Sequence, residues 1–239
     1  MAKDLEAVKV HVLKFLELNY PGFKDIFPGI ITIFNEGKIA NATVLRYTGN
    51  NLDIVIKDFS GSPRIIRSTL GRYFIFTEAR SLKRLKDIPS FPVNATVISP
   101  YTLAYDYIEG KILAHYKNQK LEKEFFLRLE EIVHKMHNNR LAHMDLRCYG
   151  NVIVGIDRNP YVIDLQSAVN IKWMPQIIQR ILKSSDLSGV YKCWKFACSE
   201  PLDNEREKDL IQFNRLKKFW LLRGYPSKYF QRKESATVI

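Results

Sequence analysis

The chain is poor in cysteine: its 239 residues include three, Cys148, Cys193 and Cys198. Three cysteines are too few for a disulfide framework, which favours a reducing, cytoplasmic compartment. Cys193 and Cys198 lack the two-residue spacing that is typical of a zinc site. No stretch approaches about 18 consecutive apolar residues, so we expect no membrane-spanning helix. The acidic start lacks a small-residue cleavage site, so we expect no signal peptide.

Acidic residues are also in the minority. The 25 Asp and Glu residues stand against 37 Lys and Arg residues, and the formal net charge is +12. Such a surplus favours polyanionic partners, and nucleic acid, an anionic membrane face and phosphorylated ligands all fit it. A solvated surface with a bias in sign explains the charge equally well. The hydrophobic content of 46% is enough for the core of one large domain or of two small lobes.

The N-terminal half alternates short apolar runs with turns. Helical periodicity over residues 3–18 predicts an amphipathic helix, which either packs on the domain or lies on a membrane surface. The segments "IITIF", "NATVLRY" and "LDIVIKDF" predict three antiparallel strands between residues 30 and 59. "FTEARSLKRLKDI" predicts a helix over residues 76–88, and "NATVISP" and "TLAYDYIEG" predict two more strands.

The C-terminal half has mainly helical patterns. "LEKEFFLRLEEIVHKMHNN" predicts an amphipathic helix with one apolar stripe, formed by Phe125, Leu129, Ile132 and Met136. "NVIV" and "YVIDL" predict a hairpin around the turn "GIDRNP", and the chain from about Lys172 onward is helical and basic. The last residues, "KESATVI", are typical of a frayed tail.

These patterns predict an α+β fold with two lobes. Residues 1–106 form an antiparallel-sheet lobe with an N-terminal helix and one internal helix. Residues 107–239 form a reduced helical lobe that holds the hairpin, and a hinge lies near residues 105–110. A cleft between two lobes is a favoured place for a ligand.

Polar residues follow one another in an order that suits phosphoryl transfer. Lys57 ends a strand, Glu78 lies on the next helix, and Asp164 ends the predicted hairpin. Between them, "HMDLRCYGN" puts His143 and further polar side chains just before a buried strand. A transferred phosphate is highly charged, so a protein must chiefly position it and neutralise its charge. A lysine can hold phosphates, one carboxylate can orient the acceptor hydroxyl, and a second carboxylate with an amide oxygen suits Mg²⁺.

This layout resembles the protein-kinase-like fold. The resemblance implies that ATP and Mg²⁺ are the cofactors, that Asp145 is the catalytic aspartate, and that Asn151 and Asp164 hold the metal. It implies an ion pair between Lys57 and Glu78 in the nucleotide site.

Arg147 stands two positions after the catalytic aspartate, where many protein kinases carry a lysine that contacts the γ-phosphate, and an arginine keeps that charge. Tyr105, Tyr107 and Ile108 fall in the hinge, whose backbone groups would bond adenine. His143 is expected to support the loop by hydrogen bonding rather than to act as a base.

More narrowly, the chain resembles the bacterial lipopolysaccharide kinases, which act on Kdo and heptose sugars, with RIO-type kinases as relatives. "KDFSGSPRIIRSTLGRYFIFTEARSLKRL" and "IDLQSA" carry this resemblance. It implies transfer of the γ-phosphate of ATP to the hydroxyl of a sugar or of a lipopolysaccharide-core-type glycolipid. It also implies a cytoplasmic protein with peripheral contact to the anionic inner face of the membrane.

Three departures from the kinase pattern leave alternatives open. Asn151 follows Asp145 by six positions where the common spacing is five, and Gly150 is the expected place for the extra residue. The loop "FNEGKIAN" has Gly37 in place of a glycine-rich motif, and the metal motif has Ser167 in place of its glycine. A Ser/Thr protein kinase or RIO-like ATPase that acts on a protein is one alternative, and a non-catalytic nucleotide-binding pseudokinase scaffold is the other.

A cluster of basic residues precedes and follows the predicted glutamate. Its members are Arg64, Arg67, Arg72, Arg80, Lys83, Arg84 and Lys86. The cluster suits anionic lipid headgroups or a phosphorylated glycan. Nucleic acid ranks lower because the sequence shows neither aromatic interleaving nor a recognition motif.

Overall fold

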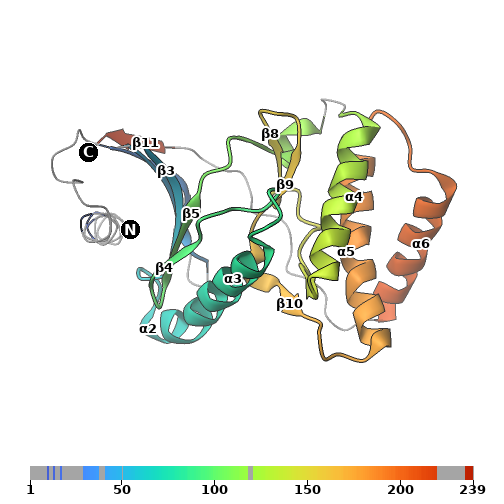
Figure 1. The fold of residues 1–239 in the computed structure, drawn as a ribbon, viewed down its shortest axis with the longest axis horizontal. Helices are drawn as coiled ribbons and strands as arrows, with labels where there is room; N and C mark the ends of the chain where they lie inside the picture. The colour runs from blue at the N-terminus through green and yellow to red at the C-terminus, as the bar shows by residue number, and fades with distance from the viewer. Residues whose placement is uncertain are drawn as a thin grey trace. The chain divides into compact units, whose positions relative to one another are not determined.

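The computed structural model describes residues 29–37, 41–49, 51–117, 121–219 and 235–238, with isolated positions 10, 13 and 17 (Figure 1). The predicted helix over residues 3–18 falls almost wholly outside this part of the chain. The described residues form two compact units. The sheet unit comprises those within Met1–Lys83, Pro92–Tyr107 and Gln231–Ile239, and the helical unit comprises those within Arg84–Phe91 and Ile108–Phe230.

The sheet unit is built on an antiparallel sheet with the order β11-β1-β2-β3-β5-β4. Its strands are β1 (Ile30–Glu36), β2 (Thr43–Gly49), β3 (Leu52–Asp58), β4 (Thr96–Ser99), β5 (Thr102–Asp106) and β11 (Ser235–Val238). The β-branched and aliphatic residues that predicted these strands form its core, which contains Ile31, Ile33, Leu45, Tyr47, Ile54, Ile56 and Ala104. The five strands predicted between residues 30 and 110 are therefore confirmed, and so is their antiparallel arrangement.

The prediction of a frayed tail is wrong for Ser235–Val238. These residues form β11, which pairs antiparallel with β1 in the register Ile30↔Val238. Thr and Val are residue types that are frequent in strands, and the edge of β1 supplies unpaired backbone groups.

The predicted start of the internal helix is also wrong. Helical structure begins at α2 (Arg64–Ile66), continues through the π-helical turn η2 (Arg67–Gly71), and ends with α3 (Arg72–Leu85). The run "RIIRSTLGRYFIF" is rich in branched and aromatic residues and contains a glycine, so its local pattern does not favour a helix. The segment is helical in its tertiary environment, where Gly71 lies against Phe59: an added Cβ on Gly71 would lie 2.9 Å from the Cβ of Phe59.

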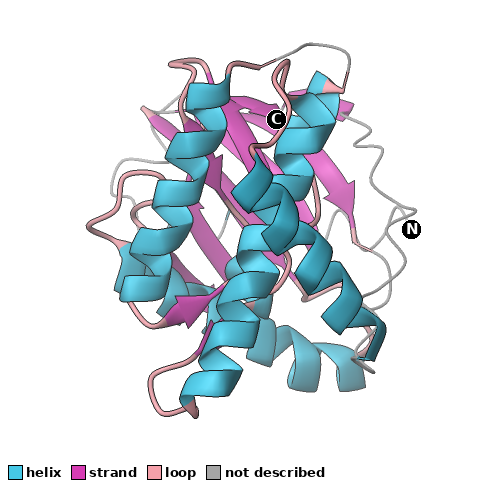
Figure 2. Ribbon diagram, turned by 90° about the vertical axis from the view of Figure 1, so that its right-hand side faces the viewer, coloured by secondary structure: helices cyan, strands magenta, loops and turns pink. Residues whose placement is uncertain are grey.

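The helical unit contains three long helices, α4 (Lys123–Asn138), α5 (Gln176–Ala197) and α6 (Asn204–Phe219). Figures 1 and 2 show that α5 lies beside both α4 and α6. The predicted stripe on α4, with Phe125, Leu129, Ile132 and Met136, is buried as expected. Trp194 of α5 is also buried and lies against the ring of Phe126, with 5.6 Å between the ring centroids.

Short strands complete the helical unit. β8 (Val152–Gly155) and β9 (Pro160–Val162) form the predicted hairpin, and β6 (Gly110–Ile112) pairs with β8. β7 (Leu141–Ala142) pairs with β10 (Val169–Asn170), which the sequence did not predict. Single turns of 3₁₀ helix, η3 (Leu113–Tyr116) and η4 (Leu165–Ser167), follow β6 and the hairpin. Among the described helices, none combines the length and the apolar character that crossing a bilayer requires.

Candidate active site

A buried ion pair lies inside the sheet unit. Lys57 is near the end of β3, and its Nζ lies 2.7 Å from Oε1 and 2.9 Å from Oε2 of Glu78 on α3. Only 6% of Lys57 and 1% of Glu78 is exposed. Burying two charges is costly unless they are paired and hydrogen-bonded, so this geometry fixes the lysine side chain in one position. The structure thus brings together the two residues of the predicted pair, and their role toward a nucleotide stays a prediction.

His143 supports the loop that follows β7. Its Nδ1 accepts a hydrogen bond from the backbone N–H of Asp145 at 3.3 Å, and its Nε2 lies 3.0 Å from the carbonyl oxygen of Ile163. A carbonyl oxygen can only accept, so Nε2 is the donor in this contact. The buried imidazole thus connects the loop to the hairpin, and its expected role as a support rather than a base stays a prediction.

The side chains of Asp145 and Asn151 are joined directly. Nδ2 of Asn151 donates to Oδ2 of Asp145 and to its carbonyl oxygen, both at 3.0 Å. The amide nitrogen of Asn151 is bonded to Asp145, so the amide oxygen of Asn151 is the atom that is suited to bind a cation. The backbone carbonyl of Asn151 also accepts from the N–H of Ile163 at 3.0 Å, which ties the loop to the residue before Asp164.

Two consecutive turns accommodate the extra residue between Asp145 and Asn151. The N–H of Cys148 donates to the carbonyl of Asp145 at 3.2 Å, and the N–H of Asn151 donates to the carbonyl of Cys148 at 3.1 Å. Gly150 has no positive φ, and an added Cβ there would meet only the sulfur of Cys148 at an ordinary 3.6 Å. The expectation that Gly150 absorbs the insertion through its conformational freedom is therefore wrong.

The environment of Asp145 alters its acidity. Burial raises the pKa of this carboxyl above its ordinary value, and the charge of Asp164 raises it further. The nearby His143, the hydrogen bond from Asn151 and the charge of Lys192 offset part of this rise. A carboxylate with a raised pKa is a stronger base than a solvated one, which suits a group that accepts a proton.

Asp164 has a left-handed backbone, with φ 66° and ψ 58°, at the start of η4. β9 ends at Val162, so the predicted continuation of that strand to Leu165 is wrong. Left-handed backbone is uncommon for residues other than glycine and persists where the surroundings impose it. Here it turns the chain out of the hairpin at the aspartate itself.

The donor set in the helical unit fits Mg²⁺. The amide oxygen of Asn151 and the carboxylate of Asp164 are hard oxygen ligands, which this ion prefers. Within the described ranges, no group of three or more His, Cys, Asp or Glu side chains could hold a metal ion by itself. A site with two protein ligands matches an ion that keeps several waters and binds substrate phosphates.

Arg147 lies against α5 and α6. Its Nη1 donates to Oγ of Ser188 at 2.8 Å, and its Nη2 donates to Oδ1 of Asn214 at 3.3 Å. Its guanidinium carbon is also 5.9 Å from the centroid of the Phe213 ring. Burial lowers the pKa of Arg147 from its ordinary value. The structure therefore places this guanidinium among helix side chains, and a role on the γ-phosphate stays a prediction.

The predicted adenine-binding segment is the end of β5 and the residues after it. Tyr105 is buried in the sheet opposite Val55. The N–H of Tyr107 donates to the carbonyl of Asp53 at 2.9 Å. The guanidinium carbon of Arg46 lies 3.7 Å from the centroid of the Tyr107 ring. The amide of Tyr107 is therefore engaged within the protein. Ile108 is half-buried and begins the next stretch of the helical unit.

The loop expected to cover the phosphates is described only in part. Gly37 follows β1 with φ +20°, and an added Cβ would lie 2.6 Å from the carbonyl oxygen of Asn41. Residues 38–40 of "FNEGKIAN" lie outside the described residues. The close approach of Gly37 to the start of β2 explains why a glycine is needed there.

One residue of the site was missed by sequence reasoning. Asp186 of α5 is buried, and its carboxylate accepts hydrogen bonds from the backbone N–H groups of His143 and Met144, both at 2.8 Å. It also lies 2.9 Å from Nε2 of His137. A carboxylate in the middle of a buried helix is the signal that could have identified it, but its partners lie 42 and 43 positions away.

Comparison with known proteins supports the fold. The sequence matches no family model and no curated protein. Solved structures do match, among them the Rio2 kinase from Chaetomium thermophilum, with a TM-score of 0.54 and 12% sequence identity. That match covers 87% of this chain and 78% of the kinase. The chain therefore has a protein-kinase-like fold, with a RIO kinase as a structural neighbour.

Proposed function

We propose that the protein is an ATP- and Mg²⁺-dependent phosphotransferase that uses a hydroxyl group as acceptor. The observation that carries this proposal is the hydrogen bond between Asn151 and Asp145, which forms although the loop has one residue more than the common spacing. It orients a carboxylate of raised pKa beside an amide oxygen and the carboxylate of Asp164. A scaffold without chemistry would have no need for this arrangement, nor for the buried Lys57–Glu78 pair in the sheet unit.

The reaction assigns a task to each residue. The acceptor oxygen attacks the γ-phosphorus of ATP, the bond from that phosphorus to the bridging oxygen breaks, and ADP leaves with the bond's electrons. Asp145 orients the hydroxyl and takes its proton, which then passes to solvent. Lys57, fixed by Glu78, holds the phosphates of the nucleotide. Asn151 and Asp164 would hold Mg²⁺, which when bound neutralises charge on the phosphate oxygens.

The test is transfer by Asp145→Asn, a variant that keeps the size of the side chain and a partner for Asn151. We expect its transfer rate to fall by about 10²–10⁴-fold, the usual contribution of a positioned base. Its stabilisation by ATP with Mg²⁺ in a thermal-shift assay should persist, because the phosphate-holding groups are unchanged. Undiminished turnover in this variant would overturn the proposal.

The identity of the phosphate acceptor is the second part of the proposal. The sequence resemblance favours a sugar or a lipopolysaccharide-core-type glycolipid, whereas the structural match to a Rio2 kinase favours a protein acceptor or an ATPase. ATP consumption measured against lipid-linked sugars, free sugars and proteins separates the two. Transfer to a generic protein or to the chain itself, without transfer to glycolipid, would favour the second candidate. Absence of Mg²⁺-dependent stabilisation by ATP would favour the pseudokinase scaffold.

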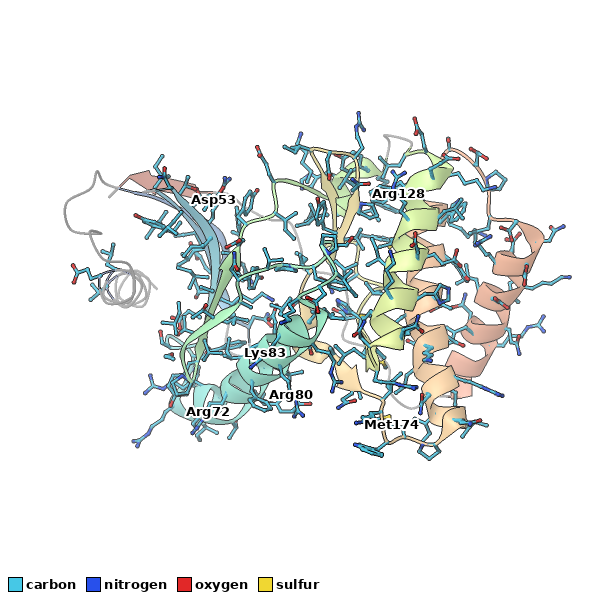
Figure 3. All side chains as sticks on the ribbon, in the orientation of Figure 1. Asp53, Arg72, Arg80, Lys83, Arg128 and Met174 are labelled. Carbon is cyan, nitrogen blue, oxygen red and sulfur yellow. The ribbon has the colours of Figure 1, made fainter. Side chains whose placement is uncertain are left out.

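The outer face of α2, η2 and α3 supports contact with an anionic membrane. Ile65 and Phe76 are 77% and 62% exposed, and Tyr73 is also exposed. Figure 3 shows Arg72, Arg80 and Lys83 along the same helical segment. Aromatic residues thus do interleave with the basic cluster, which corrects the sequence argument against nucleic acid. An exposed aliphatic such as Ile65 nevertheless favours a lipid surface, since it has no ring to stack on a base.

Vesicle sedimentation tests this contact. The protein should bind vesicles that contain anionic phosphatidylglycerol and not vesicles of phosphatidylcholine alone. Phe76→Asp should abolish binding, and Ile156→Asp, an equally exposed apolar position in the β8–β9 turn, should not. Equal binding to both vesicle types, or equal effects of the two substitutions, would contradict the membrane contact. Binding to RNA by the same face would favour nucleic acid instead.

A further inference from the structure

Helix α5 lies directly against the loop that carries Asp145. A Cβ added to Gly189 would lie 2.7 Å from the carbonyl carbon of Leu146. One turn further along the helix, Sγ of Cys193 lies 3.7 Å from the carbonyl oxygen of Leu146. The ring of Phe196 stacks on Tyr149, with 3.9 Å between centroids and an interplanar angle of 16°. The helix therefore packs tightly on the loop backbone along this face.

Lys192 is a cationic residue on the face of α5 that packs against the loop. Its Nζ donates to the carbonyl oxygen of Arg147 at 2.9 Å and lies 4.5 Å from the centroid of the Tyr149 ring. The ammonium group has three donors, and the carbonyl uses one of them. Lys192 is half-buried, so its charge acts through less water than the charge of a surface lysine. Its ammonium group thus lies on the backbone of the loop, at the residue two positions after Asp145.

Arg147, in contrast to Lys192, has its charged group bound to helix side chains. It is the loop residue at the position where a cation toward the γ-phosphate is expected, but its guanidinium donates to Ser188 and Asn214 of the helices. The guanidinium of Arg147 is thus bound to the helices, whereas the ammonium of Lys192 is bound to the loop backbone at the same residue.

We propose that Lys192 of α5 is a catalytic residue that contacts the transferred phosphate beside Asp145, in the role that sequence position assigns to Arg147. This inference rests on the proposed function. In the reaction Lys192 stays protonated: it hydrogen-bonds an oxygen of the γ-phosphoryl group while the acceptor oxygen bonds to phosphorus and the bond to ADP breaks. The acceptor proton goes to Asp145, so Lys192 neutralises charge and transfers no proton.

The decisive variant is Lys192→Gln. The glutamine amide can still donate to the carbonyl of Arg147, so the substitution removes the charge and keeps a donor for the loop. Lys192→Arg restores the charge. Lys195→Met is the matched control, because Lys195 lies on the same helix, is exposed, and pairs with Glu207 of α6. All variants are made in the full chain and compared by circular dichroism and thermal unfolding before kinetics.

We expect kcat of Lys192→Gln to fall by about 10²–10³-fold, as for loss of one group that stabilises transition-state charge. KM for ATP should change by less than about threefold, since the nucleotide is held mainly elsewhere. Lys192→Arg should recover part of kcat because it restores the charge, and Lys195→Met should match the wild type.

Other results would overturn the inference. If Lys192→Gln has wild-type kcat while the wild type is active, the inference fails and the proposed function stands. If Lys192→Gln does not fold like the wild type, or if Lys192→Arg is as impaired as Lys192→Gln, the lysine supports the loop structurally and the inference also fails. A wild-type chain that transfers phosphate to no acceptor would overturn the proposed function, and this inference with it.

Discussion

Removal of the Glu78 carboxylate should strongly destabilise the sheet unit. Glu78 and Lys57 are almost completely buried and lie 2.7 Å apart, so Glu78→Ala removes the charge partner of an ammonium group inside the protein. Breaking a buried pair in this way costs about 3–5 kcal/mol of unfolding free energy. For a chain of this size each kcal/mol lowers the melting temperature by about 2–4 °C, so a fall of about 6–20 °C is expected.

The double variant Lys57→Met/Glu78→Leu separates stability from function. Replacing both charges by apolar groups of similar volume is often neutral or stabilising by about 1–4 kcal/mol. The double variant should therefore regain most of the lost stability, while its stabilisation by ATP with Mg²⁺ should be lost. This pattern would show that the pair is kept for the nucleotide rather than for the fold.

Urea denaturation followed by two signals is the assay. Two of the three tryptophans, Trp173 and Trp194, lie in the helical unit, so their fluorescence reports that unit, whereas circular dichroism reports both units. Glu207→Ala, which breaks an exposed pair with Lys195, is the control and should change stability little. If Glu78→Ala unfolds within about 0.5 kcal/mol of the wild type, the buried-pair reasoning is refuted.

Three features of the helical unit give further tests. Gly189→Ala should lower the unfolding free energy by about 1–3 kcal/mol, because its Cβ would overlap the backbone of Leu146, and an unchanged denaturation midpoint would contradict this. Cys193 is fully buried and burial raises the pKa of its thiol to about 12, so a maleimide at about pH 8 should label it only after unfolding, as peptide mass spectrometry can show. The transfer rate should fall as the pH drops through the raised pKa of Asp145, which must be ionised to accept a proton, and a flat acidic profile would exclude that role.

The elements predicted well are those whose local pattern agrees with their tertiary environment. β3 has a continuous run of branched apolar residues at positions 54–56, and α4 has apolar residues at the period of a helix, and both sets are buried. The pairing of Lys57 with Glu78 could also be predicted, because a strand-end lysine and a glutamate on the next helix fit a known arrangement. In these cases local sequence and long-range packing favour the same structure.

The features missed depend on contacts that no short window contains. Residues 64–75 have a local pattern that does not favour a helix, yet they are helical in the fold, where Gly71 lies against Phe59. Asp186 is an ordinary polar residue in "SSDLSG", and only the fold brings it to the backbone of the loop. The orientation of Arg147 likewise depends on Asn214, which lies 67 positions later. Spacing along the chain can place a side chain in a loop, but it cannot determine which way that side chain points.

The two consecutive turns between Asp145 and Asn151 have a consequence for how such chains are classified. A comparison that counts residues from the aspartate reaches Gly150 at the common spacing of five and finds no metal ligand there. It would assign the chain to the inactive kinases. The hydrogen bond from Asn151 to Asp145 shows that the amide lies beside the aspartate although it is displaced by one position in the alignment. Loss of activity inferred from a missing letter should therefore be checked against the path of the backbone.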